Sequence, residues 1–267
     1  MSPRARKVVK PTVEIMEALP TVILGFLAGL WLAPIIEQYL PGFVATLILV
    51  PTSIIVVAAL TSVLPKEWRN RCTDGRAAVI LVPIVVVVGW LSFELSPWVE
   101  QTFFGGNVRE YITNELGITF DQRNSLVVGI AMGFAVIPTI FSIAEDAIFS
   151  VPKHLSQGSL ALGATTWQTL TKVVLLTASP GIFSAVMMGL GRAVGETMIV
   201  LMATGNTPIL DWNIFEGMRT LSANIAIEMP ESEVGSSHYR ILFLAAFVLF
   251  IFTFAFNTLA ELVRQRL

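Results

Sequence analysis

Charged side chains are scarce in this sequence. Of its 267 residues, 13% are charged and 54% are hydrophobic, and the mean hydropathy is +0.74. A soluble domain carries about a quarter charged residues, so this shortage excludes an ordinary globular domain. The composition instead indicates an integral membrane protein.

The sequence also has only one cysteine, and it lacks the phosphate-binding loop of ATPases. Cys72 is the only cysteine, which excludes a disulfide within the chain and argues against a thiolate metal site. No lysine follows a glycine, so the sequence lacks the Gly-x-x-x-x-Gly-Lys-Ser/Thr motif. We therefore expect that the chain does not hydrolyse ATP and holds no cofactor or metal of its own.

Six apolar stretches are long enough to cross a bilayer, which takes about 20 mostly apolar residues. They are continuously apolar, whereas the strands of a membrane barrel alternate at period two. The sequence thus predicts an all-α, polytopic membrane helix bundle of about six transmembrane helices. The predicted spans are 19–36, 43–64, 77–98, 125–144, 179–204 and 239–263.

Basic residues are distributed unequally between the two sides that these spans define. Twelve fall on the side of both termini, and four fall on the other, which makes the first side cytoplasmic. The cytoplasmic set is Arg4, Arg6, Lys7, Lys10, Lys66, Arg69, Arg71, Arg76, Lys153, Lys172, Arg264 and Arg266; the outward set is Arg109, Arg123, Arg219 and Arg240.

The same topology divides the chain into segments. A transmembrane domain over 19–263 follows a cytoplasmic segment, 1–18, and precedes a cytoplasmic tail, 264–267. Loops 65–76 and 145–178 are predicted to be cytoplasmic. Loops 37–42, 99–124 and 205–238 are predicted to face outward, and the last is either a simple connector or a docking face for an outside partner.

The predicted helix 179–204 contains two charged residues, Arg192 and Glu196. With Ser179 as its cap, Arg192 would lie about 20 Å along the axis, near mid-bilayer. A charge there costs about 2.5–3.5 kcal/mol on insertion scales. The spacing of four places both side chains on one face of a continuous helix. Small residues such as Ala185 and Gly189 would let another helix pack closely.

Two interpretations of this charged pair stay open. It is either a structural ion pair, or Arg192 contacts an anion in transit while Glu196 balances its charge in an empty path. Glu196 could also accept a hydrogen bond from a phosphate hydroxyl. Charges inside the membrane usually mark pathways, and the arginine fork matches phosphate oxygens. We therefore predict a substrate path at Arg192, Glu196 and Thr197.

The cytoplasmic loop 145–178 is longer than a simple connection requires. Its apolar residues suggest two short amphipathic helices broken at Gly163. The segment is either a platform for a cytoplasmic protein or an interfacial helix on the bilayer. Interfacial helices are usually rich in Lys and Arg, whereas this loop has only Lys153 and Lys172.

This loop resembles the coupling loop of binding-protein-dependent ABC importer permeases. Gly163 takes the position of the family's glycine, although Gln157 replaces its acidic residue and Leu176 its proline. The motifs "GLGRAVGETM", "GNTP", "EIMEALPTVILG" and "AVIPTIFSIAEDAIFSVP" further resemble phosphate-specific permeases of the PstC type over residues 14–263. The resemblance implies ATPase coupling through Gln157, Gly158, Ser159, Leu162, Gly163, Ala164 and Trp167.

The resemblance also implies a fold, a location and partners. The fold would be that of a type I ABC importer permease in the bacterial cytoplasmic membrane. The partners would be an ATPase dimer that binds ATP and Mg, a second homologous permease, an extracytoplasmic phosphate-binding protein and the surrounding lipid, with no nucleic acid. Such permeases carry helices before "EALPT", so we expect a fragment, a split-gene product or a shortened permease.

Alternative functions differ in substrate or energy source. A permease for sulfate or another oxyanion would use similar chemistry. A proton-coupled secondary transporter subunit would explain Glu196 as a proton site but not the long cytoplasmic loop. A membrane enzyme is disfavoured because no His, Asp or Cys falls within the predicted spans.

The topology can be tested by labelling single introduced cysteines after Cys72→Ser. Because of the basic asymmetry, Leu160→Cys should react from the cytoplasm, and Asn107→Cys and Ser232→Cys from outside. The measurement is labelling of intact cells by a membrane-impermeant maleimide, with lysed cells as the control. Labelling of positions 107 and 160 from the same side would contradict the predicted span count.

Overall fold

The computed structural model describes residues 3–63 and 76–266. In these residues every regular element is a helix, which confirms the all-α prediction. Five helical stretches are long and apolar enough to cross a membrane: Thr21–Gln38, Leu40–Val57, Ser125–Phe149, Thr166–Gly195 and Ser237–Gln265. A sixth is formed if the pair Leu81–Glu94 and Ser96–Asn114, bent by 41°, counts as one span. Lys66, Arg69, Arg71 and Cys72 lie outside the described residues.

Most of the described residues lie in helices. In chain order they are α1 (Pro3–Glu17), α2 (Thr21–Leu27), α3 (Ala33–Gln38), α4 (Leu40–Val63), α6 (Arg76–Glu94), α7 (Ser96–Phe103), α8 (Val108–Asn114), α9 (Ser125–Phe149), α10 (Lys153–Ala161), α11 (Thr166–Thr169), α12 (Leu175–Gly195), α13 (Met198–Ala203), α14 (Leu221–Glu228) and α15 (Ser237–Arg266). π-Helical turns at Ala28–Leu32 and Leu170–Val174 join α2 to α3 and α11 to α12, and a 3₁₀ turn, Met229–Glu231, follows α14.

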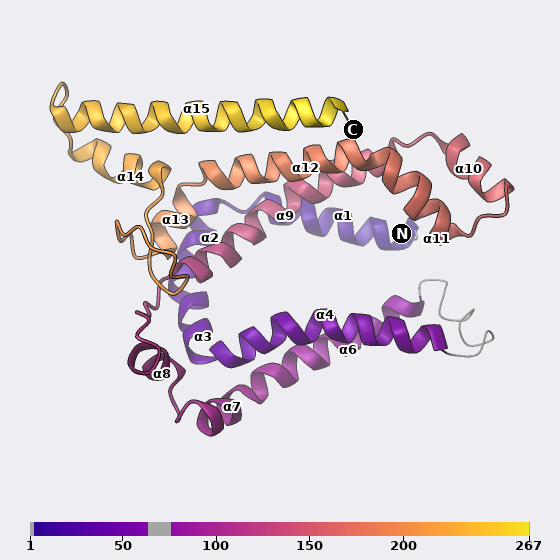
Figure 1. Cartoon of the computed structure of the whole chain (residues 1–267), viewed down its shortest axis with the longest axis horizontal. Helices are drawn as coiled ribbons and strands as arrows, with labels where there is room; N and C mark the ends of the chain where they lie inside the picture. The colour runs from indigo at the N-terminus through magenta and orange to yellow at the C-terminus, as the bar shows by residue number, and fades with distance from the viewer. Residues whose placement is uncertain (1–2, 64–75, 267) are drawn as a thin grey trace.

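The long helices lie roughly parallel (Figure 1). Helix α9 packs against α1 and α12, and α12 packs against α15, whereas α4 and α6 form a separate hairpin joined to the rest through α3 and α7. Both termini lie with α10 and α11 at one end, which we call the α10 end. Helices α7, α8 and α14 lie at the opposite end, the α14 end.

Small residues set the contact between α9 and α12. Ala185 and Gly189 of α12 are buried, and a Cβ atom at Gly189 would collide with the side chain of Ile140. Gly181 faces Ala147 in the same way. The close packing predicted for this helix is therefore confirmed, and its neighbour is α9.

A second close contact joins α2 and the following π turn to α13. A Cβ atom at Gly25 would lie 2.9 Å from the carbonyl oxygen of Met198, and one at Gly29 only 2.6 Å from that of Met202. The two glycines are four residues apart, so they form a small-residue stripe of the kind that lets membrane helices approach backbone to backbone.

The helix predicted over 179–204 has different bounds. It runs from Thr166 to Gly195, with Thr165 as its cap, so the prediction that Ser179 caps it is wrong. Pro180 lies inside the helix and has no N–H for the carbonyl of Leu176. The Ser179 hydroxyl donates to that carbonyl instead, at 2.8 Å, which satisfies the backbone and lets the helix continue.

The predicted loops also contain more helix than expected. Helix α9 extends to Phe149 and the next candidate span begins at Thr166, so the predicted loop 145–178 is reduced to residues 150–165, which contain α10. In the predicted loop 99–124 the structure has the end of α7 and all of α8. The predicted loop 205–238 contains α14 and the 3₁₀ turn that follows it.

The α2–α13 contact predicts a position-specific effect of adding one methyl group. Gly29→Ala should destabilise the protein by roughly 1–3 kcal/mol, because the new Cβ would overlap the Met202 carbonyl. The measurement is the thermal unfolding midpoint of the detergent-solubilised chain.

The matched control is Gly133→Ala in α9, where an added Cβ meets nothing within 4 Å. It should leave the midpoint unchanged or raise it, since alanine favours helix over glycine. Equal midpoints for the two variants would show that α2 and α13 do not meet through this glycine.

Candidate functional site

Arg192 connects three helices. It lies near the end of α12, and its Nη1 donates to Thr139 Oγ1 of α9 at 2.7 Å. The same nitrogen lies 3.7 Å from Glu17 Oε1 at the end of α1. Thr139 also donates a long hydrogen bond to Glu17, at 3.5 Å, so the three side chains form one cluster.

The prediction that Arg192 and Glu196 share one face of a continuous helix is wrong. The helix ends at Gly195, and Glu196 has extended backbone angles, φ −66° and ψ 127°, so the spacing of four no longer places both on one face. Glu196 Oε1 instead accepts weak hydrogen bonds from the backbone N–H groups of Met198 and Ile199, at 3.2 and 3.4 Å. Its carboxylate therefore accepts hydrogen bonds from N–H groups in the first turn of α13, which have no partner within that helix.

The depth of Arg192 in the bilayer stays a prediction, because the helix that carries it begins at Thr166 and ends at Gly195, close after Arg192. Its partner Thr139 lies in the middle of α9, about 21 Å from Ser125 at 1.5 Å per residue. Thr139 thus lies inside the candidate span Ser125–Phe149, whereas Arg192 lies close to the end of the candidate span Thr166–Gly195. We call Arg192, Thr139 and Glu17 the arginine cluster; it joins the ends of α12 and α1 to the middle of α9.

The chain is broken next to this cluster. Gly195 ends α12, and α13 begins at Met198, with Glu196 and Thr197 between them. Thr197 donates to the Gly195 carbonyl at 3.3 Å, and Ser222 of α14 donates to the Glu196 carbonyl at 3.0 Å. Irregular backbone at membrane depth is tolerated where it is buried in protein or lines a water-filled cavity.

The arginine cluster is only partly enclosed by this chain. The side chain of Arg192 is 33% exposed and that of Glu17 is 45% exposed. Within the described residues, Nε and Nη2 of Arg192 have no hydrogen-bond partner, because both contacts use Nη1. The guanidinium therefore keeps donors that could bind an oxyanion through two parallel hydrogen bonds.

The predicted coupling segment forms a helix–glycine–helix unit at the α10 end (Figure 1). Gly163 has φ +87°, a left-handed conformation that glycine adopts without strain. Thr165 caps α11 in a reciprocal capping box with Gln168, and Ser159 and Thr169 share a hydrogen bond of 3.0 Å. These bonds fix the angle between α10 and α11.

Most side chains of this unit are exposed and are not covered by the rest of the described chain. Leu162 is 91% exposed and Trp167 is 70% exposed, and Gln157 and Gly158 are exposed as well. Ser159 and Ala164 are half-buried. Leu162 and Trp167 are thus large apolar side chains that this chain leaves uncovered at its α10 end.

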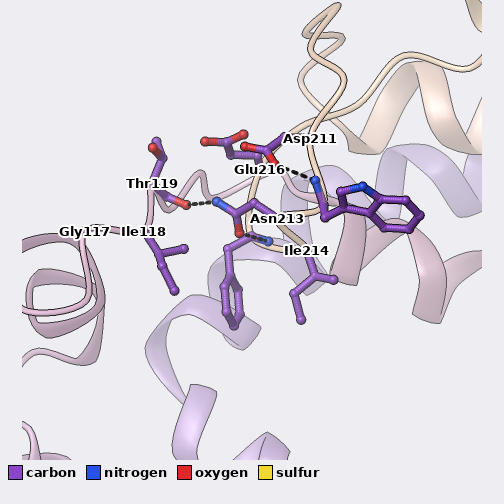
Figure 2. A pocket seen from close by; sticks show the side chains of 9 residues that line it. Gly117, Ile118, Thr119, Asp211, Asn213, Ile214 and Glu216 are labelled. Atoms are coloured by element: carbon purple, nitrogen blue, oxygen red, sulfur yellow. Dashed lines mark hydrogen bonds between the residues drawn. The ribbon is translucent and has the colours of Figure 1, made fainter.

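A pocket of about 400 Å³ lies at the α14 end, between residues 117–119 and 211–216 (Figure 2). Asn213 crosses it and donates to the Thr119 carbonyl at 2.8 Å. Asp211 and Glu216 both line it, so it is unsuited to an oxyanion. Nearby Trp212 is 99% exposed.

The sequence interpretation missed Glu17 and Thr139 as members of the site. Glu17 falls just before the first apolar stretch, so it was assigned to the cytoplasmic segment 1–18. The sequence carried one signal of such a partner. An arginine inside the membrane requires one, and few acidic residues lie near apolar stretches, but this does not say which of them is the partner.

The comparisons with known proteins agree with this architecture. Residues 75–267 match the family of binding-protein-dependent transport system inner membrane components. The chain belongs to this family. It is therefore a permease subunit of an ABC transporter, a multi-pass inner membrane protein that works with an ATPase and a binding protein and is not itself an enzyme.

Curated relatives extend the match over most of the chain. It is 32% identical to the phosphate transport system permease protein PstC of Xylella fastidiosa (strain 9a5c), over 88% of this chain and 74% of the relative. The PstC of Mesorhizobium japonicum is 31% identical, over 88% and 73%. A probable ABC transporter permease protein, YqgH of Bacillus subtilis (strain 168), is 31% identical, over 83% and 67%. No solved structure matches the chain.

Proposed function

We propose that the chain is the permease subunit of an ATP-driven importer of inorganic phosphate and forms half of the translocation path. The arginine cluster carries this proposal, because it holds a cation with spare donors against Thr139, which lies in the middle of the candidate span Ser125–Phe149. The printed names of the PstC relatives support phosphate as the substrate.

In this proposal the path passes the break between α12 and α13. Arg192 binds the anion, and Glu196 and Thr197 shape the irregular backbone beside it. The partly exposed faces of Arg192 and Glu17 are covered by a second, homologous permease subunit, which completes the path.

Coupling to ATP occurs at the α10 end. The unit of α10, Gly163 and α11 inserts into a groove of a separate ATPase dimer, which binds ATP and Mg. Trp167 and Leu162 are exposed and can serve as apolar anchors. The helical stretch Thr166–Gly195 is continuous from this unit to Arg192, so a shift of the ATPase can reach the arginine cluster.

The orientation follows from the same proposal. The α10 end and both termini are cytoplasmic, and the α14 end faces outward and receives an extracytoplasmic phosphate-binding protein. The basic residues support this assignment, since most of them fall in the segments that the sequence predicts to be cytoplasmic.

Another oxyanion such as sulfate is the second candidate substrate. The guanidinium fork binds any tetrahedral oxyanion, and the printed name of YqgH specifies no substrate. Family membership favours an ATP-driven importer, for either substrate, over a proton-coupled secondary transporter subunit.

Substrate and path are tested by removing the cation. Arg192→Ala should abolish uptake of radiolabelled phosphate in cells with wild-type amounts of protein in the membrane, because the anion loses its only fixed positive partner in the cluster. Uptake of labelled sulfate is measured in parallel.

The control is Arg264→Ala, which removes an exposed pair with Glu261 on α15 and should leave uptake unchanged. Normal phosphate uptake by Arg192→Ala would limit the cluster to a structural role. Uptake of sulfate but not of phosphate by the wild type would reassign the substrate.

Coupling is tested at Gly163. Gly163→Glu should reduce ATPase co-purification severalfold, because a side chain at φ +87° strains the turn and the new carboxylate extends from the docking surface. An added Cβ at this glycine meets nothing within 4 Å, so the effect comes from the backbone angle and from the partner, not from crowding within the chain.

Gly235→Glu is the matched control. Gly235 also has φ +87° and open space around it, but it lies before α15 at the α14 end. The ATPase should co-purify with this variant as with the wild type. Equal ATPase recovery with both variants would remove α10–α11 as the coupling element.

A further inference from the structure

Glu17 occupies an unusual position for an acidic residue. It is the last residue of α1, and the chain then passes through Ala18 and Leu19 to Pro20, whose backbone is extended. Its carboxylate lies 3.7 Å from Arg192 Nη1, beyond hydrogen-bond distance, whereas Thr139 accepts from the same nitrogen at 2.7 Å. Arg192 thus has one close neutral partner and one looser charged partner.

The other nearby acid is unavailable for the same role. The carboxylate of Glu196 is held by the backbone N–H groups of Met198 and Ile199, and its own backbone carbonyl is held by Ser222. Moving it toward Arg192 would leave the start of α13 unsatisfied, which is costly away from water. Glu17 is therefore the acid that balances Arg192 in the described structure.

We propose that Glu17 is the exchangeable counter-ion of Arg192, which a tetrahedral oxyanion displaces as it binds, while Thr139 keeps the guanidinium in place. The inference rests on the proposed function and names a further residue that sets anion affinity. Arg192 is paired with a carboxylate when the path is empty and with the oxyanion when it is occupied, so its charge is balanced in both states.

The arrangement also discriminates between anions. A displacing ion must replace the carboxylate charge and use the free Nε and Nη2 donors at the same time. Phosphate and sulfate present several acceptor oxygens and can do both, whereas chloride cannot bridge the fork. The exchange is reversible because Glu17 sits at a helix end, is 45% exposed, and stays close enough to return.

The test measures anion affinity separately from folding. The full chain is purified with its partner subunits, and the thermal unfolding midpoint is titrated with inorganic phosphate at constant ionic strength, balanced by potassium chloride. Glu17→Gln should lower the half-maximal phosphate concentration about tenfold, the change given by an ion pair of roughly 1.4 kcal/mol. The turnover of phosphate uptake should fall, because nothing then competes the anion away from Arg192.

Glu14→Gln is the matched control, since Glu14 is an exposed carboxylate one turn earlier on α1. It should keep the wild-type phosphate affinity and turnover. In the Glu17→Gln background, Arg192→Gln should remove the phosphate effect, and chloride alone should stabilise none of the proteins.

The outcomes separate this inference from the proposed function. The counter-ion role would be overturned if Glu17→Gln bound phosphate no more tightly than the wild type. The phosphate path would still stand if adding Arg192→Gln to that variant removed the stabilisation by phosphate. A response of Glu17→Gln to sulfate only would support the counter-ion role and overturn phosphate as the substrate. No stabilisation of any variant by either oxyanion would overturn both.

Discussion

A positive charge that must be balanced inside an apolar bundle is the constraint around which this structure is organised. Arg192 cannot face lipid at low cost, so protein must supply its partners. They come from two other helices, Thr139 from α9 and Glu17 from α1. This requirement brings the end of α1, the middle of α9 and the end of α12 to one point. The small residues of α12, Ala185 and Gly189, permit the approach.

Backbone satisfaction is the second constraint, and it explains where the long helix continues and where it stops. At Pro180 a ring replaces an N–H, but the Ser179 hydroxyl bonds the orphaned carbonyl and the helix continues. At Gly195 the helix ends, and the break is accepted because Glu196 caps α13 through its side chain while Ser222 bonds its carbonyl. Each irregularity thus has a nearby side chain that replaces the missing hydrogen bond.

The sequence predicted what depends on composition and local chemistry. Apolar runs are long enough to specify spans, and the glycine between two short amphipathic segments specified the turn at Gly163. It could not predict the break at Glu196, because hydropathy is continuous across residues 179–204 and gives no signal of backbone direction. It also could not predict Glu17 as a partner of Arg192, since that contact depends on how α1 folds back along α9.

The two sides of the break are attached to different neighbours, and this difference suggests how motion would act on the cluster. Helix α13 is held by backbone contact with Gly25 and Gly29, and the Glu196 carbonyl is held by α14. Arg192 lies on the other side, at the end of the continuous stretch that begins at Thr166 beside the exposed α10–α11 unit. A displacement of that unit along α12 would move Arg192 relative to Glu17 while α13 stayed in place. Because Coulomb energy varies inversely with distance, a shift of about 1 Å in a 3.7 Å contact changes the balance between carboxylate and bound anion.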